Sequence, residues 1–427
     1  MNSNKLRQLV YDLRHQPVVT WITLTGTALS VFLLMTVISM EQLDTMPFAP
    51  ESNRPRLLFG QNMEVGFIGS QGSSSSALGY SPAEKLYRGL PGVEMEAMFQ
   101  IESQNAEAEG STGRPYEVKC RRVDHNFWKI YDHTLLEGRY FDSIECAAGT
   151  RMAVISQEMA RNLFNNENVI GSEVLVGYVP YKVVGVVKNT SALARQASGD
   201  IFLPMSQATA SSYQHGMLGN VSVVMLLEDG ADKEKIRNEV KARYATLATE
   251  LADQGMEPIY HEQPYDVGTV NRGGYGSNNS PDDSGYKRER MITYLILLLL
   301  PAINLSSMLH SRIRRRVSEF GIRRAFGCTR ARLMGDIISE NFVMTVFGAL
   351  VGWLCSLVFL MSYSGLYQNG WGDIIGDTPA LTMLLDWRLL LILLGVCFIL
   401  NIISASLPAW LASRVNTVEA INGRHTK

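Results

Sequence analysis

Residues 312–332 read RIRRRVSEFGIRRAFGCTRAR and place eight arginines within one short segment. An apolar run ends just before this segment, and another begins soon after it. Arginine is costly at the centre of a bilayer and favourable at its cytoplasmic face. The segment therefore predicts a short cytoplasmic loop between two transmembrane helices, and this orientation sets the topology of the neighbouring helices.

Four runs reach the roughly 20 apolar residues that a helix needs to cross a bilayer. They cover residues 18–40, 291–311, 337–363 and 387–410. The first run could also be a secretory signal. Its apolar part is longer than the usual signal core, and no clean small-x-small cleavage site precedes Glu41. We therefore expect an uncleaved membrane anchor at this position.

Charges beside the runs orient them. Basic residues precede the first run and follow the fourth, and they are Lys5, Arg7, Arg14, Arg414, Arg424 and Lys427. The connection 364–386 has three aspartates and no Lys or Arg. Both termini and the loop 312–336 are therefore predicted to be cytoplasmic, and residues 41–290 to lie outside. The basic KRER at 287–290 is a counter-signal, but charge after a long translocated domain has little influence.

The first 17 residues have a pattern of their own. Leu6, Leu9, Val10 and Leu13 follow helical spacing, which predicts an amphipathic helix in the inner membrane interface. An ordinary frayed terminus is the alternative. Pro17 separates this segment from the first span, because it disfavours helix at the residue before it.

The outside segment has the composition of an α+β domain. Helical spacing appears at Gln157–Phe164 and at Asp232–Gln254, where Ile236, Val240, Tyr244 and Leu247 form one stripe. The Ser/Gly-rich tract Gly69–Gly79 is expected to be a mobile loop, and residues 268–286 a flexible tether. Strand-like runs occur at Tyr116–Val123, Arg151–Ser156, Glu173–Tyr178, Tyr181–Val187 and Asn220–Leu227.

Motifs for chemistry are missing from the sequence. It has no phosphate-binding G-x-x-x-x-G-K-[ST], no H-E-x-x-H, no G-x-S-x-G and no paired C-x-x-C. We therefore predict no catalytic, cofactor-binding or metal-binding residues. His125 and His133 stand near aspartates, but surface polarity around Trp128 is the favoured interpretation over a metal site. A net charge of −2 gives no basis for nucleic-acid binding.

Small and polar residues in the spans indicate packing. Gly348 and Gly352 in the third span allow a close approach of two helices. Pro301 removes a backbone hydrogen bond in the second span, for which a bending or packing role is favoured over a substrate path. Cys120 and Cys146 both lie in the outside segment, where a disulfide is permitted, and the sequence leaves that bond open.

The chain resembles the MacB/FtsX-type permeases of ATP-binding cassette (ABC) systems, which include the LolC and LolE lipoprotein-release subunits. Residues 318–330 (SEFGIRRAFGCTR) look like the coupling segment of that family, which typically reads EIGIRRALGA. Thr417 stands where the family usually has proline. Further similar motifs are LEGRYF at 136–141, VISQEMA at 154–160, VVGVVK at 183–188, PAWLA at 408–412 and VEAI at 418–421.

The resemblance implies a fold and a set of partners. The fold is an α-helical membrane protein with four transmembrane helices plus a large α+β extracytoplasmic domain like the MacB periplasmic core domain. MacB itself carries a fused ATPase domain. This chain instead resembles a separate permease subunit. That resemblance implies that a partner ABC-type ATPase uses the ATP, and that this chain binds no cofactor. A second permease copy or paralogue is expected, and a periplasmic adaptor is left open.

The expected mechanism is transmission of motion through the membrane. Phe320, Ile322 and Ala325 would supply an apolar knob on the ATPase, and Glu319, Arg323 and Arg324 polar contacts. Gly321 lies between them. Arg312, Arg314, Arg315 and Arg316 would anchor the loop to anionic headgroups, which is also the simplest interpretation of the whole arginine cluster.

Three classes of function follow from these expectations. The leading one is an export permease of the bacterial inner membrane for peptides, antibiotics or lipoproteins. The alternatives are an FtsX-like regulator of a cell-wall hydrolase and a membrane-anchored sensor or structural protein without an ATPase.

Overall fold

The structure is a computed structural model, and it divides into two compact units. The sheet unit is Gln42–Asp282, and the helical unit joins Met1–Glu41 to Asp283–Lys427. The residues whose structure is described are 17–69, 72–101, 106–165, 169–191, 194–206, 212–213, 216–271, 285–297, 299, 322, 326–367, 391–392, 394–396, 398–399 and 402.

One continuous sheet runs through the sheet unit. Its neighbouring strands follow the order β17–β1–β15–β4–β7–β12–β9–β11–β10–β5–β6, mostly antiparallel, with parallel pairs at β7–β12 and β9–β11. The first strands are β1 (Leu57–Gly60), β2 (Asn62–Phe67), β3 (Ser73–Leu78), β4 (Val93–Ile101), β5 (Ala106–Glu109), β6 (Pro115–Val118), β7 (Cys120–Val123) and β8 (Leu135–Gly138). The others are β9 (Met152–Ser156), β10 (Glu173–Val176), β11 (Val179–Val187), β12 (Ile201–Pro204), β13 (Ser212–Tyr213), β14 (Leu218–Gly219), β15 (Val221–Leu227), β16 (Met256–Ile259) and β17 (Tyr265–Asp266).

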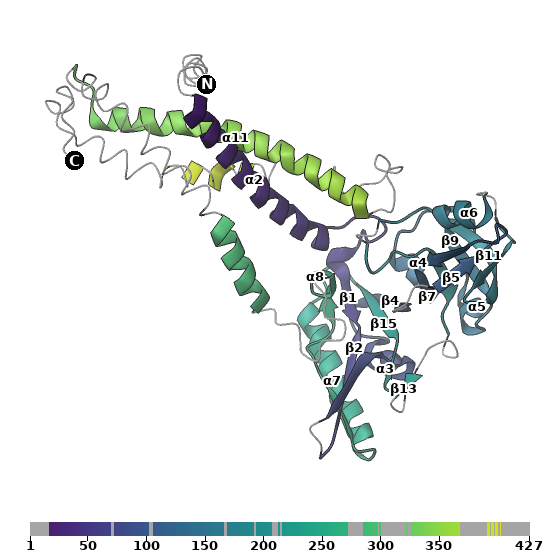
Figure 1. Cartoon of the computed structure of the whole chain (residues 1–427). Coiled ribbons are helices and arrows are strands. Elements are labelled where there is room, and N and C mark those ends of the chain that lie inside the picture. Colours follow the sequence, from purple (N-terminus) through teal and green to yellow (C-terminus); the bar gives the residue numbers. More distant parts are fainter. Residues whose placement is uncertain are drawn as a thin grey trace. The chain divides into compact units, whose positions relative to one another are not determined.

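The first lobe of the sheet unit is built around β15. All seven residues of this strand are buried, as expected for a continuous apolar run at the centre of a sheet. Helix α7 (Lys233–Ala252) places Ile236, Val240, Tyr244 and Leu247 on the core of this lobe, as the predicted stripe requires. Helix α3 (Tyr80–Tyr87) joins the same core. Figure 1 shows α7 and α3 in the lobe that contains β1, β2 and β15.

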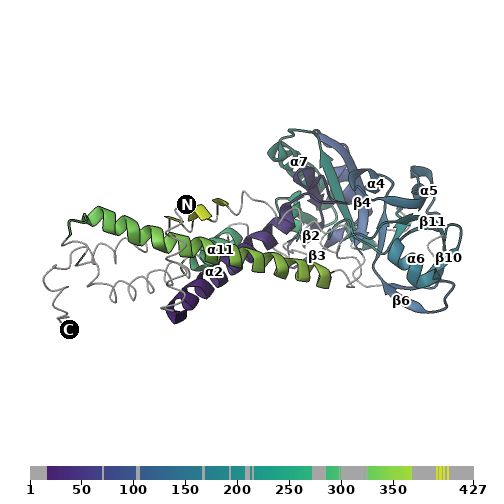
Figure 2. The ribbon, with the colours of Figure 1, turned by 90° about the horizontal axis from the view of Figure 1, so that it is seen from above.

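The second lobe has a separate core beneath α6 (Gln157–Phe164). Ser156 caps this helix by accepting a hydrogen bond from the Met159 N–H, and Asn165 ends it in the left-handed conformation at φ 53°. Met159, Ala160 and Leu163 pack against β9, β10 and β11. The short helices of the whole sheet unit, in either lobe, are α4 (Phe127–Ile130), α5 (Ser143–Ala147), α8 (Val267–Asn271) and the 3₁₀ turn Arg54–Arg56. Both views separate this lobe from the first (Figures 1 and 2).

Most predicted elements of the sheet unit are confirmed. Helix α6 has the predicted bounds, and β9, β10, β11 and β15 lie on the predicted runs. The run Tyr116–Val123 forms two strands rather than one. The strand is interrupted at Lys119, so that β6 pairs with β5 while β7 pairs with β4 and β12.

Two expectations for flexible segments are wrong in part. The tract Gly69–Gly79 contains β3, whose serines pair with β2 and whose Leu78 is fully buried beside β14 and β15. Neighbouring strands supply the hydrogen bonds here, so low hydrophobicity does not prevent a strand. The predicted tether 268–286 begins inside α8, where Val270 and Asn271 are buried. Residues 272–284 lie outside the described part of the chain.

The helical unit contains α2 (Pro17–Thr45) and α11 (Arg330–Tyr367). Among the described residues these two helices are long and apolar enough to cross a membrane, over Thr20–Gln42 and Phe342–Leu360. Residues 285–297 are also helical. The predicted second and fourth spans lie largely outside the described residues, as do residues 1–16, so four spans remain a prediction. Helix α11 already begins at Arg330, inside the predicted loop.

Candidate functional site

The predicted coupling segment is described only at its C-terminal end. Glu319, Phe320, Gly321, Arg323, Arg324 and Ala325 lie outside the described residues, as do Arg312, Arg314, Arg315, Arg316 and Pro301. Ile322 is described and half exposed, and its carbonyl accepts a hydrogen bond from the Phe326 N–H at 3.1 Å. This bond between Ile322 and Phe326 has the i→i+4 spacing of one α-helical turn.

A sharp break follows that turn. Gly327 has φ +87°, a left-handed conformation that ends helices and that glycine adopts without strain. Thr329 then caps the start of α11, because its hydroxyl accepts a hydrogen bond from the Arg332 N–H at 3.3 Å. The Phe326 ring is 88% exposed just before the break. Sequence reasoning left Phe326 out of the apolar knob, although a large aromatic beside a helix-ending glycine is a visible signal.

The two predicted packing glycines lie where α11 crosses α2. A Cβ atom on Gly352 would stand 2.3 Å from the Ala28 carbonyl oxygen and 3.0 Å from the Phe32 nitrogen. A Cβ atom on Gly348 would stand 2.9 Å from Cβ of Thr27. Only glycine permits such a close approach of two helix backbones.

Apolar side chains surround this crossing. Val31, Leu34 and Met35 of α2 are buried with Ala349 of α11, and Trp353 packs against them. The Phe32 and Phe359 rings meet edge to face with centroids 5.6 Å apart. Tyr294 and Leu297 of the helical residues 285–297 join the same cluster. Leu394 of the predicted fourth span packs there too, so the described parts of all four predicted spans share one packed interior.

Glu41 links α2 to the helical residues 285–297. Its carboxylate lies 2.5 Å from Nη2 of Arg290 and accepts a hydrogen bond from the Tyr294 hydroxyl. The Arg290 guanidinium also lies 5.5 Å from the centroid of the Tyr294 ring. We call Glu41, Arg290 and Tyr294 the clasp. It joins the two helical segments that flank the sheet unit in the sequence.

The cysteines and histidines of the sheet unit occupy packed positions. Cys120 and Cys146 are both buried and are not joined by a disulfide. The sequence suggested a polar surface in this region, and that prediction is wrong for His133, which is buried. Its ring stacks on Phe127 and meets Trp128 and Phe202 edge to face. Burial and the nearby Arg121 charge lower the pKa of His133 to about 3, so its ring is neutral.

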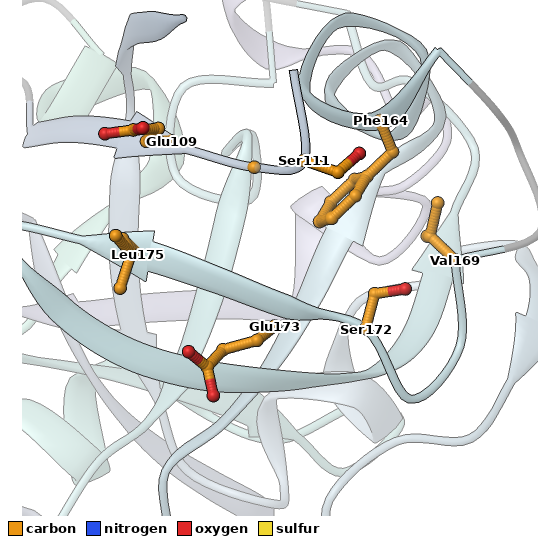
Figure 3. A pocket seen from close by; sticks show the side chains of 8 residues that line it. Glu109, Ser111, Phe164, Val169, Ser172, Glu173 and Leu175 are labelled. Atoms are coloured by element: carbon orange, nitrogen blue, oxygen red, sulfur yellow. The ribbon is translucent and has the colours of Figure 1, made fainter. Parts of the chain in front are cut away.

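A cavity of about 520 Å³ opens in the second lobe. It lies where β5, the end of α6 and the start of β10 meet, and the Phe164 side chain extends toward it from α6 (Figure 3). Its lining consists of Glu109, Gly110, Ser111, Phe164, Val169, Ser172, Glu173 and Leu175. An aromatic wall with two carboxylates suits a cationic ligand better than an anionic one.

The described residues contain no cluster of His, Cys, Asp and Glu able to hold a metal ion. Two helices long and apolar enough to cross a membrane, together with a large α+β unit, are typical of a membrane protein with one large folded domain. Residues 20–243 match the family described as MacB-like periplasmic core domain, and residues 291–417 match the FtsX-like permease C-terminal family. This chain belongs to the MacB/FtsX-type ABC transporter permease family, and the match to the MacB-like periplasmic core domain covers most of α2 and most of the sheet unit.

Several curated relatives are similar to this chain in sequence. The ABC transporter permease YknZ of Bacillus subtilis is 23% identical over 343 residues, which are 78% of this chain and 77% of YknZ. The pyoverdine export ATP-binding/permease protein PvdT of Pseudomonas aeruginosa is 24% identical over 353 residues, 78% of this chain and 49% of PvdT. The macrolide export protein MacB of Bdellovibrio bacteriovorus is 22% identical over 67% of this chain and 41% of MacB. The chain thus spans about half or less of these two ATP-binding/permease relatives.

Solved structures give distant matches. The periplasmic region of MacB from Actinobacillus actinomycetemcomitans matches 50% of this chain with 14% identity and a TM-score of 0.34, covering 91% of that structure. The extracellular domain of YknZ matches 47% of this chain with 16% identity and a TM-score of 0.32, covering all of that structure.

Proposed function

We propose that this chain is a permease subunit that transmits the ATP-driven motion of a partner ATPase to its sheet unit. The motion serves export or extrusion of peptides, antibiotics or lipoproteins from the bacterial inner membrane. Four spans place both termini and the arginine loop in the cytoplasm and the sheet unit outside. A second permease copy or paralogue completes the assembly, and the chain itself binds no cofactor.

The clasp is the observation that carries the proposal. The sheet unit is inserted in the sequence between α2 and the helical residues 285–297, and Glu41 joins these two helical segments to each other. Two helices held together at one end move as a pair, so motion of either one is delivered to both ends of the inserted unit. Glu41 also pairs with Arg290, which offsets one of the three basic charges in KRER and weakens this counter-signal.

The end of the coupling segment supports the same mechanism. Phe326, whose N–H bonds to the Ile322 carbonyl, presents an exposed aromatic ring between that bond and Gly327, beside the start of α11. An apolar side chain on a short cytoplasmic turn suits insertion into a groove of a second protein. Helix α11 then carries a push on this turn to its crossing with α2.

Substitution of Gly321 tests the coupling role. Gly321→Pro removes a backbone donor and disfavours helix at Phe320, so we expect normal membrane insertion with loss of substrate-stimulated hydrolysis by the co-purified ATPase. Gly321→Ala is the matched control, because it retains the donor and favours helix, and it should keep the stimulation.

The results separate the proposed function from its alternatives. Unchanged stimulated hydrolysis in Gly321→Pro contradicts the coupling role of the segment. Purification of the wild-type chain in mild detergent without any ATPase contradicts the transporter itself and favours a sensor or structural protein. Recovery of a cell-wall hydrolase with the ATPase favours the FtsX-like regulator.

A further inference from the structure

The sheet unit meets the rest of the chain through two connections. The N-terminal connection is Met46–Arg54, which follows α2, and the C-terminal connection is α8, which precedes the helical residues 285–297. A third segment, Ala194–Ser198, lies between β11 and β12, and we call it the junction loop. More than a hundred residues separate it from the N-terminal connection, yet it touches both connections.

Glu51 fixes the N-terminal connection to the junction loop. One carboxylate oxygen accepts hydrogen bonds from the backbone N–H groups of Gln196 and Ala197, both at 3.0 Å. The other oxygen lies 2.6 Å from Nε of Arg54. Both side chains are almost fully buried, at 1% and 2% residue exposure. Charge-assisted hydrogen bonds of this kind, shielded from water, are strong and geometrically fixed.

The connection itself is braced by the same arginine. Arg54 donates a hydrogen bond from Nη1 to the Met46 carbonyl at 3.2 Å, and its guanidinium lies 4.0 Å from the centroid of the Phe48 ring. Met46 is the first residue after α2. The end of the helix and the carboxylate of Glu51 are thus held to one guanidinium group.

Arg195 fixes the C-terminal connection to the same loop. Its Nη1 donates a hydrogen bond to the Asn271 carbonyl at 2.6 Å. Asn271 is the last residue of α8, and it is buried at 3% exposure. Neighbouring residues of one loop, Arg195 and Gln196, therefore bind opposite ends of the sheet unit.

Arg121 ties the junction loop to the sheet. Its guanidinium donates hydrogen bonds to three carbonyls of the loop, those of Arg195, Gln196 and Ser198, at 3.0, 2.8 and 3.1 Å. Arg121 belongs to β7, which pairs with β4 of the first lobe and with β12 of the second. The buried Arg121 guanidinium thus connects the junction loop to β7, the strand that pairs with both lobes.

We infer that the junction loop couples the two connections, so that displacement of either one reaches both lobes through Glu51, Arg195 and Arg121. This inference deepens the proposed function and rests on it. Three positioning residues distribute the motion, and none of them has to touch a transported substrate. The loop is the shared attachment point, and β7 is the route from it into the sheet.

Hydrogen exchange on the full-length permease with its co-purified ATPase tests the inference. Trapping the ATPase with ATP and vanadate should change exchange in β12 and β15 of the wild-type protein. In Glu51→Gln and in Arg195→Gln this change in β12 should fall at least fivefold, while the response of α2 remains. Glu64→Gln is the matched control. Glu64 is also a buried carboxylate, 2.6 Å from His261 and from the Ser73 hydroxyl, and it should keep the wild-type response.

The same variants without the ATPase separate two kinds of failure. In the permease alone, Glu51→Gln should speed exchange of the Gln196 and Ala197 amides at least tenfold, with β15 still protected as evidence of folding. An unchanged β12 response in both variants overturns the inference, and so does unchanged exchange of these two amides. A wild-type complex without any nucleotide response in the sheet unit contradicts the proposed function instead, and the amide measurement then decides the role of the loop.

Discussion

Gly352→Ala should separate α11 from α2, because the added methyl group meets backbone atoms that cannot rotate away. The 2.3 Å approach to the Ala28 carbonyl oxygen falls 1.1 Å short of the 3.4 Å at which ordinary contact begins. If the two helices move apart by about 0.5–1 Å to relieve this clash, each dispersion contact between them loses a quarter to a half of its energy. Overpacking of this kind costs roughly 1–3 kcal/mol, more than the ~1 kcal/mol that alanine gains over glycine in a helix.

Two further glycines of α11 supply the comparison. A methyl group on Gly335 meets nothing within 4 Å, so Gly335→Ala should be neutral or slightly stabilising. A methyl group on Gly348 meets Cβ of Thr27 at 2.9 Å and no backbone atom closer than 3.4 Å, so Gly348→Ala should have an intermediate effect. From the most to the least stable, the expected order of the variants is therefore Gly335→Ala, Gly348→Ala and Gly352→Ala.

Unfolding of the full-length protein by sodium dodecyl sulfate in bicelles measures this order. Trp353 packs against the crossing and reports loss of the contact by its fluorescence. The reasoning is refuted when Gly352→Ala and Gly335→Ala unfold at the same detergent fraction.

Three other predictions concern the sheet unit. Glu51→Ala should destabilise it by about 3–5 kcal/mol in thermal or urea unfolding, because Arg54 would stay buried without its carboxylate; a loss below ~1 kcal/mol would contradict this. Tyr178 is 86% exposed with φ 65°, so Tyr178→Asn should raise stability by up to ~1 kcal/mol, and an equal or lower unfolding midpoint would argue against backbone strain there. The folded pKa of His133 lies below its unfolded value of 6.5, so its contribution to stability is complete above pH 6.5 and is lost as the pH falls toward 3. His133→Phe should therefore lose less stability than the wild type between pH 7.5 and 5. Equal losses of stability in the two proteins would exclude His133 as the source of the pH dependence.

Local patterns account for the elements that the sequence predicted well. The bounds of α6 follow from Ser156 at its start and Asn165 at its end, and α7 follows from one apolar stripe. Strand β3 was missed because its serines carry no hydrophobic signal, and its stability comes from pairing with β2. Helix α8 was missed because its glycine and threonine have low helix propensity, while burial of Val267 and Val270 holds it in place.

The site was predictable only where it depends on local sequence. Glycines spaced four apart in an apolar run pointed to the helix crossing, and the motif around Ile322 pointed to the coupling segment. The bonds of Glu51 to Gln196 and of Arg195 to Asn271 join residues far apart in the chain. No periodicity or spacing marks such pairs, because their geometry arises only after the sheet has formed.

Both ends of the sheet unit are attached to one loop, and this has an evolutionary consequence. An inserted body whose ends are tied together internally needs little from the helices that carry it, apart from two points of covalent attachment. Such a body can be exchanged for a relative with a different recognition surface while the membrane machinery stays intact. Chimaeras joined near Met46 and Asn271 should therefore tolerate replacement of everything between these residues.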